Sequence, residues 1–234
     1  MFLRILIHDK SFRTITLAES VHATSKRLVK TFGLELHVIN PELIEQLKRR
    51  NHLFVANHIT YLDILVLASL YPMNFITSTE MKDHPILGKL TEFGGSLYTN
   101  RSSIKSLPQE VELVAEFLRN GFNLGLFPEG TSFDGEVMRP FRNSLFQSAI
   151  EAGVPIQPIC LRYTKINDKS IDNEDRRKIA WINNEPFHSH LKRVLKYNSI
   201  SIDITILPEI LPDESNRKIL AAKVWDLINQ AYIR

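Results

Sequence analysis

The sequence predicts a single α/β domain, with a mixed, mostly parallel central sheet flanked by helices. From residue 52 onward, short apolar runs of strand length alternate with helical patterns, which is typical of a sheet covered by helices. The 234 residues can bury a full core without disulfides or metals. The single cysteine, Cys160, excludes an internal disulfide and zinc-finger spacing. We expect an N-terminal amphipathic helical segment over 1–40 and the α/β domain over 41–234.

Each element follows from its own pattern. The expected strands are 52–56, 74–78, 95–99, 122–127, 156–162 and 199–207, the last with isoleucine at every second position from 200 to 206, as in a half-buried strand. The expected helices are 64–70, 84–92, 106–119, 144–152 and 214–232, several with apolar residues on one face. The polar stretch 164–177 is expected to be an inserted loop.

The N-terminal segment carries the basic charge of the chain. Residues 1–50 hold nine Lys/Arg and five Asp/Glu, an excess of +4, whereas the rest carries −1. Apolar residues recur at roughly helical spacing from Ser11 to Phe32. Two roles stay open: a helix packed on the domain, or one lying in an anionic membrane surface. The total of +3 is too small to indicate nucleic-acid binding.

No membrane-spanning helix is expected. The longest stretch without Asp, Glu, Lys or Arg is Ile64–Thr79, which has 16 residues and contains Pro72. A spanning helix needs about 20 apolar residues, so any membrane contact is expected to be peripheral or monotopic.

A histidine and an aspartate follow the strand at 52–56. His58 lies just past the strand end, where α/β proteins place their ligands, and Asp63 begins the next helix. A turn between them can fold the carboxylate onto the imidazole, leaving the other ring nitrogen as a general base. The alternative is a helix-capping aspartate beside an unrelated histidine.

The sequence offers this base no protein nucleophile. It has no Gly-x-Ser-x-Gly elbow, which a hydrolase of that type would need. Cys160 lies within an apolar strand and is expected to be a core residue. The pattern therefore favours a substrate that brings its own nucleophile, for example a hydroxyl.

Three further blocks stand near predicted strand ends. The strand at 122–127 ends in Pro128-Glu129-Gly130, where glycine permits a tight turn, and Glu129 is expected to project into the same rim as His58. Arg101 follows the strand at 95–99, where a guanidinium can bind phosphate. The apolar segment 154–159 contains two prolines and could line an acyl groove. Alone, each block could equally be an ordinary turn, a surface arginine or an edge strand.

Together, the blocks resemble the glycerolipid acyltransferase family of the lysophospholipid acyltransferase superfamily. The matching blocks, in the family's order, are Asn57-His58-x4-Asp63, Asn100-Arg101, Phe127-Pro-Glu-Gly-Thr131 and Val154-Pro-Ile-x-Pro-Ile159. They span 57–159, less than half of the chain, and their combination is far more specific than any one of them.

The resemblance implies direct acyl transfer from acyl-CoA or acyl-carrier protein to a lysolipid hydroxyl, without an acyl-enzyme, metal or other cofactor. His58 would be the base and Asp63 would orient it. Substrate-binding residues would be Arg101, Glu129, Gly130 and Thr131. The family often continues the third block with arginine, but this chain has Ser132, and Arg139 and Arg142 are expected to compensate, Arg142 at a position where the family often has lysine.

The implied acceptor is 1-acyl-sn-glycerol-3-phosphate, giving phosphatidic acid in phospholipid biosynthesis. The alternatives are a lyso-ornithine lipid or another lysophospholipid, a non-catalytic lipid-binding homologue, and a thioesterase. The implied partner surface is the cytoplasmic face of a membrane.

Overall fold

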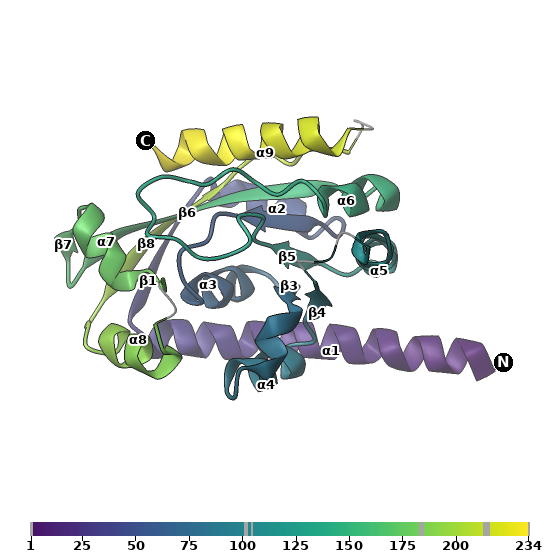
Figure 1. Ribbon diagram of the computed structural model, residues 1–234, viewed down its shortest axis with the longest axis horizontal. Coiled ribbons are helices and arrows are strands. Elements are labelled where there is room, and N and C mark those ends of the chain that lie inside the picture. The colour runs from purple at the N-terminus through teal and green to yellow at the C-terminus, as the bar shows by residue number, and fades with distance from the viewer. Residues whose placement is uncertain (1, 101–102, 104, 183–184, 213–215, 234) are drawn as a thin grey trace.

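The computed structural model describes residues 2–100, 103, 105–182, 185–212 and 216–233, with side chains from Arg13 onward except that of Gln46. An eight-stranded sheet forms the centre of this part of the chain (Figure 1). The strands are β1 (Leu34–Ile39), β2 (Leu53–Ala56), β3 (Asn74–Ser78), β4 (Leu97–Thr99), β5 (Leu124–Leu126), β6 (Ile156–Ile166), β7 (Lys169–Ser170) and β8 (Ile200–Ile206).

The strand order brings the loops that follow β2 and β5 together at the carboxyl ends of these strands. The order is β1-β8-β6-β2-β5-β3-β4, and β7 pairs with the end of β6. The pairings β6–β8 and β6–β7 are antiparallel, and the others are parallel. The mixed, mostly parallel sheet predicted from the sequence is therefore confirmed. Because β2 and β5 are parallel neighbours, the residues that follow them emerge side by side.

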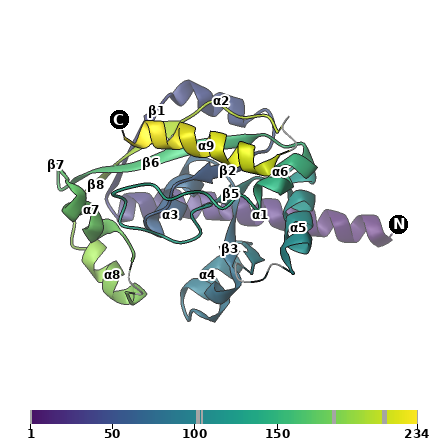
Figure 2. The same cartoon turned by 45° about the horizontal axis from the view of Figure 1, so that its top comes forward.

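Helices cover both faces of the sheet (Figures 1 and 2). The α-helices are α1 (Phe2–Thr31), α2 (Ile44–Leu47), α3 (Leu62–Leu70), α4 (Leu87–Phe93), α5 (Leu107–Arg119), α6 (Phe146–Ala152), α7 (Asn173–Ile179), α8 (Phe187–Val194) and α9 (Arg217–Tyr232), with 3₁₀ turns at Pro41–Leu43 and Thr79–Asp83. Helices α1 and α3 lie on one face, whereas α5, α6 and α9 lie on the other.

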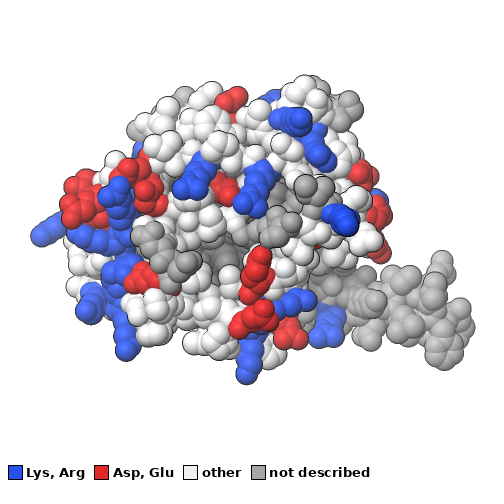
Figure 3. All heavy atoms as spheres, viewed as in Figure 1, with Lys and Arg blue, Asp and Glu red and all other residues white. Residues whose placement is uncertain are grey.

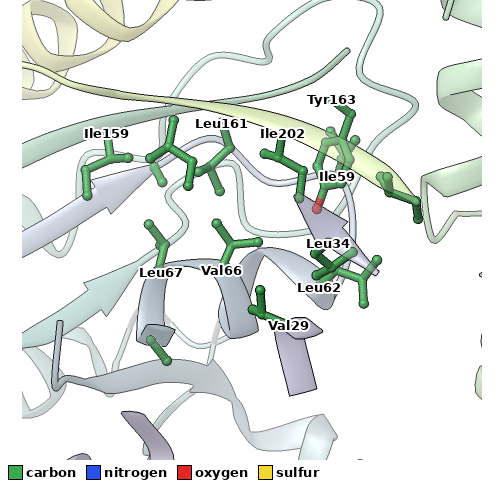
Figure 4. Close-up of a cluster of buried hydrophobic side chains, with 14 of the residues drawn as sticks. Val29, Leu34, Ile59, Leu62, Val66, Leu67, Ile159, Leu161, Tyr163 and Ile202 are labelled. Atoms are coloured by element: carbon green, nitrogen blue, oxygen red, sulfur yellow. The ribbon is translucent and has the colours of Figure 1, made fainter. Parts of the chain in front are cut away.

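Strand β2 shows how the sequence builds two cores. Leu53 and Val55 belong to the cluster beneath α5, α6 and α9, whereas Phe54 and Ala56 belong to the cluster beneath α3. Side chains alternate across a strand, so a strand buried on both faces is apolar throughout. Figure 4 shows side chains of α3, such as Val66, pointing at those of the sheet.

The N-terminal segment differs from its expected form. Helix α1 ends at Thr31, and Leu34–Ile39 forms β1, which pairs in parallel with β8. Gly33 makes the break: its φ is 64°, and a Cβ there would lie 2.3 Å from the carbonyl oxygen of Asn198. The expectation of a helical segment extending to residue 40 was therefore wrong for its last residues.

The stretch 164–177 is also more regular than expected. Strand β6 continues to Ile166 and returns through β7, because Asn167 and Asp168 both take positive φ, 49° and 64°, as a tight hairpin requires. Asp172 then caps α7 by accepting the N–H of Asp175. Figure 3 shows acidic and basic side chains beside one another over α7. The expectation of an inserted loop was wrong here.

In the described part of the chain, no helix has the length and apolar character needed to cross a membrane.

Candidate active site

His58 is fixed by the end of β2. The preceding residue, Asn57, is buried, donates its side-chain amide to the carbonyl of Leu161 at 2.8 Å, and accepts the Leu161 N–H at 2.9 Å. This pair of hydrogen bonds to β6 fixes the backbone just before His58. The imidazole Nδ1 lies 2.8 Å from the Asp63 carboxylate, and the two side chains are 16% and 1% exposed. The pairing expected from their spacing is present.

The Asp63 carboxylate is surrounded by donors. Its Oδ2 accepts from His58 Nδ1 and from the N–H groups of Ile59 and Thr60, at 2.8–3.0 Å. Its Oδ1 accepts the hydroxyl of Tyr163 at 2.7 Å. An ionised carboxylate only accepts hydrogen bonds, so Nδ1 is the donor to Asp63, and in the neutral imidazole the lone pair lies on Nε2. The geometry therefore presents Nε2 as a proton acceptor.

Tyr163 is fully buried on β6, and its hydroxyl is held in the protonated form. Removal from water, reinforced by the neighbouring Asp63 charge, raises its pKa well above the ordinary value. The hydroxyl is thus a dependable donor to Asp63. The sequence analysis missed this residue, since it lies 100 positions from Asp63 and nothing near it in the sequence marks it.

Aromatic rings restrict the imidazole. Phe127 stacks on His58 with ring centroids 4.2 Å apart and planes 20° apart. Phe75 stacks on Phe127 with centroids 6.2 Å apart. Phe127 ends the run that leads into the Pro-Glu-Gly turn, so the loop after β5 supports the side chain at the end of β2.

Glu129 joins two loops. One oxygen accepts the N–H of His58 at 2.8 Å, and the other accepts the N–H of Arg139 at 3.1 Å. The residue is 7% exposed. Burial raises the pKa of its carboxyl to about 7, although the two backbone hydrogen bonds oppose that rise. Glu129 does reach the rim of His58, as expected, but both its oxygens bind backbone. Its expected contact with substrate stays a prediction.

The other expected binding residues are distributed as follows. Gly130 takes a φ of 83°, and a Cβ there would lie 2.8 Å from Nε of Arg142. Glycine thus lets the guanidinium lie against the turn. Arg142 is exposed, and its N–H donates to the carbonyl of Pro128 at 2.9 Å. Thr131 is exposed. Arg101 lies outside the described residues.

A cavity of about 160 Å³ opens beside these residues. Phe127, Pro128, Gly130 and Arg142 form one side of it. The remaining lining residues are Ile76, Thr99, Asn100, Ser103, Leu107, Glu110, Leu126, Ser144 and Leu145. The cavity therefore combines apolar walls with a cation, a carboxylate and several hydroxyl groups, and one of its lining residues, Phe127, stacks on His58.

Metal-ligating side chains do not gather in the described residues: no group of three or more His, Cys, Asp or Glu could hold an ion there. The expectation of a site without a cofactor stays a prediction.

The family follows from the match of more than half of the chain. A family model described as Acyltransferase matches residues 35–162. The chain belongs to the acyltransferase family. The matched residues contain His58, Asp63 and Glu129, so the paired side chains described above lie within the family's own region.

Curated acyltransferases match over different lengths. The lyso-ornithine lipid O-acyltransferase of Pseudomonas aeruginosa is 34% identical over 183 residues, which are 78% of this chain and 68% of that protein. The 1-acyl-sn-glycerol-3-phosphate acyltransferase of Neisseria gonorrhoeae is 39% identical over 111 residues, which are 47% of this chain and 44% of that protein. The chain thus spans about half to two thirds of these relatives.

A solved acyltransferase has the same fold. The crystal structure of the 1-acyl-sn-glycerophosphate (LPA) acyltransferase PlsC from Thermotoga maritima superposes with a TM-score of 0.68. The alignment covers 100% of this chain and 88% of that one, at 18% identity. The predicted α/β fold is thereby confirmed independently of the sequence motifs.

Proposed function

We propose that this acyltransferase moves a fatty acyl group from a thioester donor to the free hydroxyl of a lysolipid. The observation that carries the proposal is the His58–Asp63 pair, whose Nδ1 to Oδ2 distance is 2.8 Å. The donor is acyl-CoA or acyl-carrier protein, because either presents the same thioester.

The mechanism needs no acyl-enzyme. His58 Nε2 takes the proton from the lipid hydroxyl, and the oxygen attacks the thioester carbonyl. Asp63 stabilises the imidazolium that forms. The tetrahedral intermediate then collapses, the carbon–sulfur bond breaks, and the thiolate leaves with the proton that His58 returns. A new ester and a free thiol are the products.

Two acceptors are supported by different observations. The relative from Neisseria supports 1-acyl-sn-glycerol-3-phosphate, which would give phosphatidic acid, and it has the higher identity over a shorter match. The relative from Pseudomonas supports a lyso-ornithine lipid and matches more of the chain. In either case Arg142, Gly130 and Thr131, together with Arg101, would hold the acidic part of the head group.

We also propose peripheral contact with the cytoplasmic face of a membrane through the start of α1. Residues 1–17 hold three Lys/Arg and one Asp/Glu, an excess of +2, which favours contact with an anionic surface. Ala18 and Val29 of α1 are buried in the domain, so the proposal concerns the residues that precede them.

The decisive experiment compares wild type with His58→Ala in a thiol-release assay. We expect the substitution to lower turnover by about 10²- to 10⁴-fold, the usual contribution of a positioned base. The assay uses both thioester donors with a panel of lysolipid acceptors. His188→Ala is the matched control, because His188 is an exposed residue of α8, and circular dichroism checks the fold.

Three outcomes would contradict the proposal. Near-normal turnover in His58→Ala would exclude the histidine as the base. Free fatty acid released without any acceptor would indicate a thioesterase. Tight lysolipid binding without thiol release would indicate a binding protein.

A further inference from the structure

The cavity bordered by Phe127 and Gly130 is lined by two opposite charges among the described residues. Arg142 comes from the loop that follows β5, and Glu110 comes from the first turn of α5. The Oε1 atom of Glu110 accepts the N–H of Asn100 at 2.8 Å. Within the described residues, its Oε2 atom has no hydrogen bond. This half-buried carboxylate can therefore accept a further donor from a molecule in the cavity.

The two charges favour some head groups over others. A phosphate beside Arg142 would be attracted by the guanidinium but repelled by the Glu110 carboxylate. A head group that carries both a carboxylate and an ammonium meets an opposite charge at each residue. Discrimination of this kind arises from repulsion of one ligand as well as attraction of the other.

We propose that Glu110 is a specificity-determining residue that selects an acceptor with an amino-acid head group over one with phosphate alone. Glu110 accepts hydrogen bonds from the ammonium group, and Arg142 pairs with the carboxylate. This inference rests on the proposed function, since it concerns the acceptor of the same acyl transfer. It assigns the choice between two lysolipid classes to one side chain outside the four sequence blocks.

A purely structural role for Glu110 can be separated from this one. The bond to Asn100 holds the loop after β4, and Glu110→Gln keeps a carbonyl oxygen that can accept it. The substitution removes only the negative charge. A change in acceptor preference would therefore report the charge rather than the position of the loop.

The test measures kcat/KM of wild type and Glu110→Gln with lyso-ornithine lipid and with 1-acyl-sn-glycerol-3-phosphate, using both thioester donors. We expect wild type to favour lyso-ornithine lipid, and the ratio of the two values to fall about ten- to a hundredfold in the variant, as for loss of a charged hydrogen bond. Glu112→Gln is the matched control, since Glu112 is an exposed residue of α5 that pairs with Arg119. Its ratio should equal that of wild type.

The remaining outcomes overturn the inference. A ratio unchanged in Glu110→Gln, or an equal loss with both acceptors, would show that the charge does not select the head group. A wild-type preference for the phosphate acceptor would do the same. If wild type acylated neither lysolipid with either donor, the proposed function itself would fail, which is a separate result.

Discussion

At the scale of single residues, the carboxylate of Asp63 is the most constrained group in the site. Its donors come from the loop after β2 and from the middle of β6. The loop donors could be expected from the sequence, because they lie within five positions of Asp63. The hydroxyl of Tyr163 could not, since only the register of β6 beside β2 brings it there.

Tyr163→Phe tests the positioning of Asp63. The substitution removes one hydroxyl and leaves Oδ1 of Asp63 without that donor, so the carboxylate holds the imidazole less firmly. We expect kcat to fall about five- to tenfold, as for loss of one hydrogen bond, with little change in KM. Steady-state kinetics with saturating acceptor would measure it.

The control for Tyr163→Phe is Tyr71→Phe, because Tyr71 packs against the same core cluster and lies outside the site. A lower melting temperature with an unchanged kcat would show that Tyr163 only stabilises the fold.

At the scale of elements, alternating apolar runs made most of the sheet predictable, whereas the edges of the fold were not. Strand β1 was not predicted, because the helical spacing of α1 leads almost directly into it. Only the conformation of Gly33 separates the two elements. Helix α8 separates a polar face from a buried one but has only 8 residues, which is too short for its pattern to stand out in the sequence. Local patterns thus identify elements that bury a face and miss those defined by their partners in space.

Removal of residues 1–12 tests the membrane contact of α1. We expect weaker co-sedimentation with vesicles that contain anionic lipid, because the segment combines apolar and basic residues. The domain should stay folded, since Ala18, Ser25 and Val29 still bury their side chains. Acylation of a short-chain acceptor that is free in solution should be preserved.

A matched variant for this truncation is Lys26→Gln with Arg27→Gln, which removes two exposed charges of α1 and keeps its length. Undiminished vesicle binding by the truncated protein would discard the proposed role of the segment.

At the scale of the whole molecule, the buried carboxyl of Glu129 links stability to pH. Burial raises its pKa from 4.5 to about 7, so the folded protein keeps this proton to a higher pH than the unfolded chain does. Folding therefore takes up a proton within this window. The contribution of this carboxyl to the stability of the folded protein is fully present below pH 4.5, falls as the pH rises, and reaches its lowest value above about pH 7.

Urea unfolding of wild type and Glu129→Gln across this pH range would measure the effect. We expect wild type to lose about 1–3 kcal/mol relative to the variant between pH 4.5 and pH 7. Parallel stability curves would show that the carboxyl titrates normally in the folded protein.

The candidate site was predictable where chemistry and spacing coincide. His58 and Asp63 lie five positions apart in the sequence, so their contact follows from the local geometry of the loop after β2. The approach of Glu129 to His58 needed only the parallel pairing of β2 and β5. The cavity was not predictable, because Glu110 reaches it from α5 through the packing of several elements.

The bridge made by Glu129 has a consequence for catalysis. A single carboxylate ties the backbone of His58 to that of Arg139, in the loop between β5 and α6 that also carries Arg142. A lipid head group that displaced this loop would therefore displace the backbone of His58 as well. We therefore expect the rate of transfer, as well as the binding affinity, to depend on how the acceptor contacts this loop.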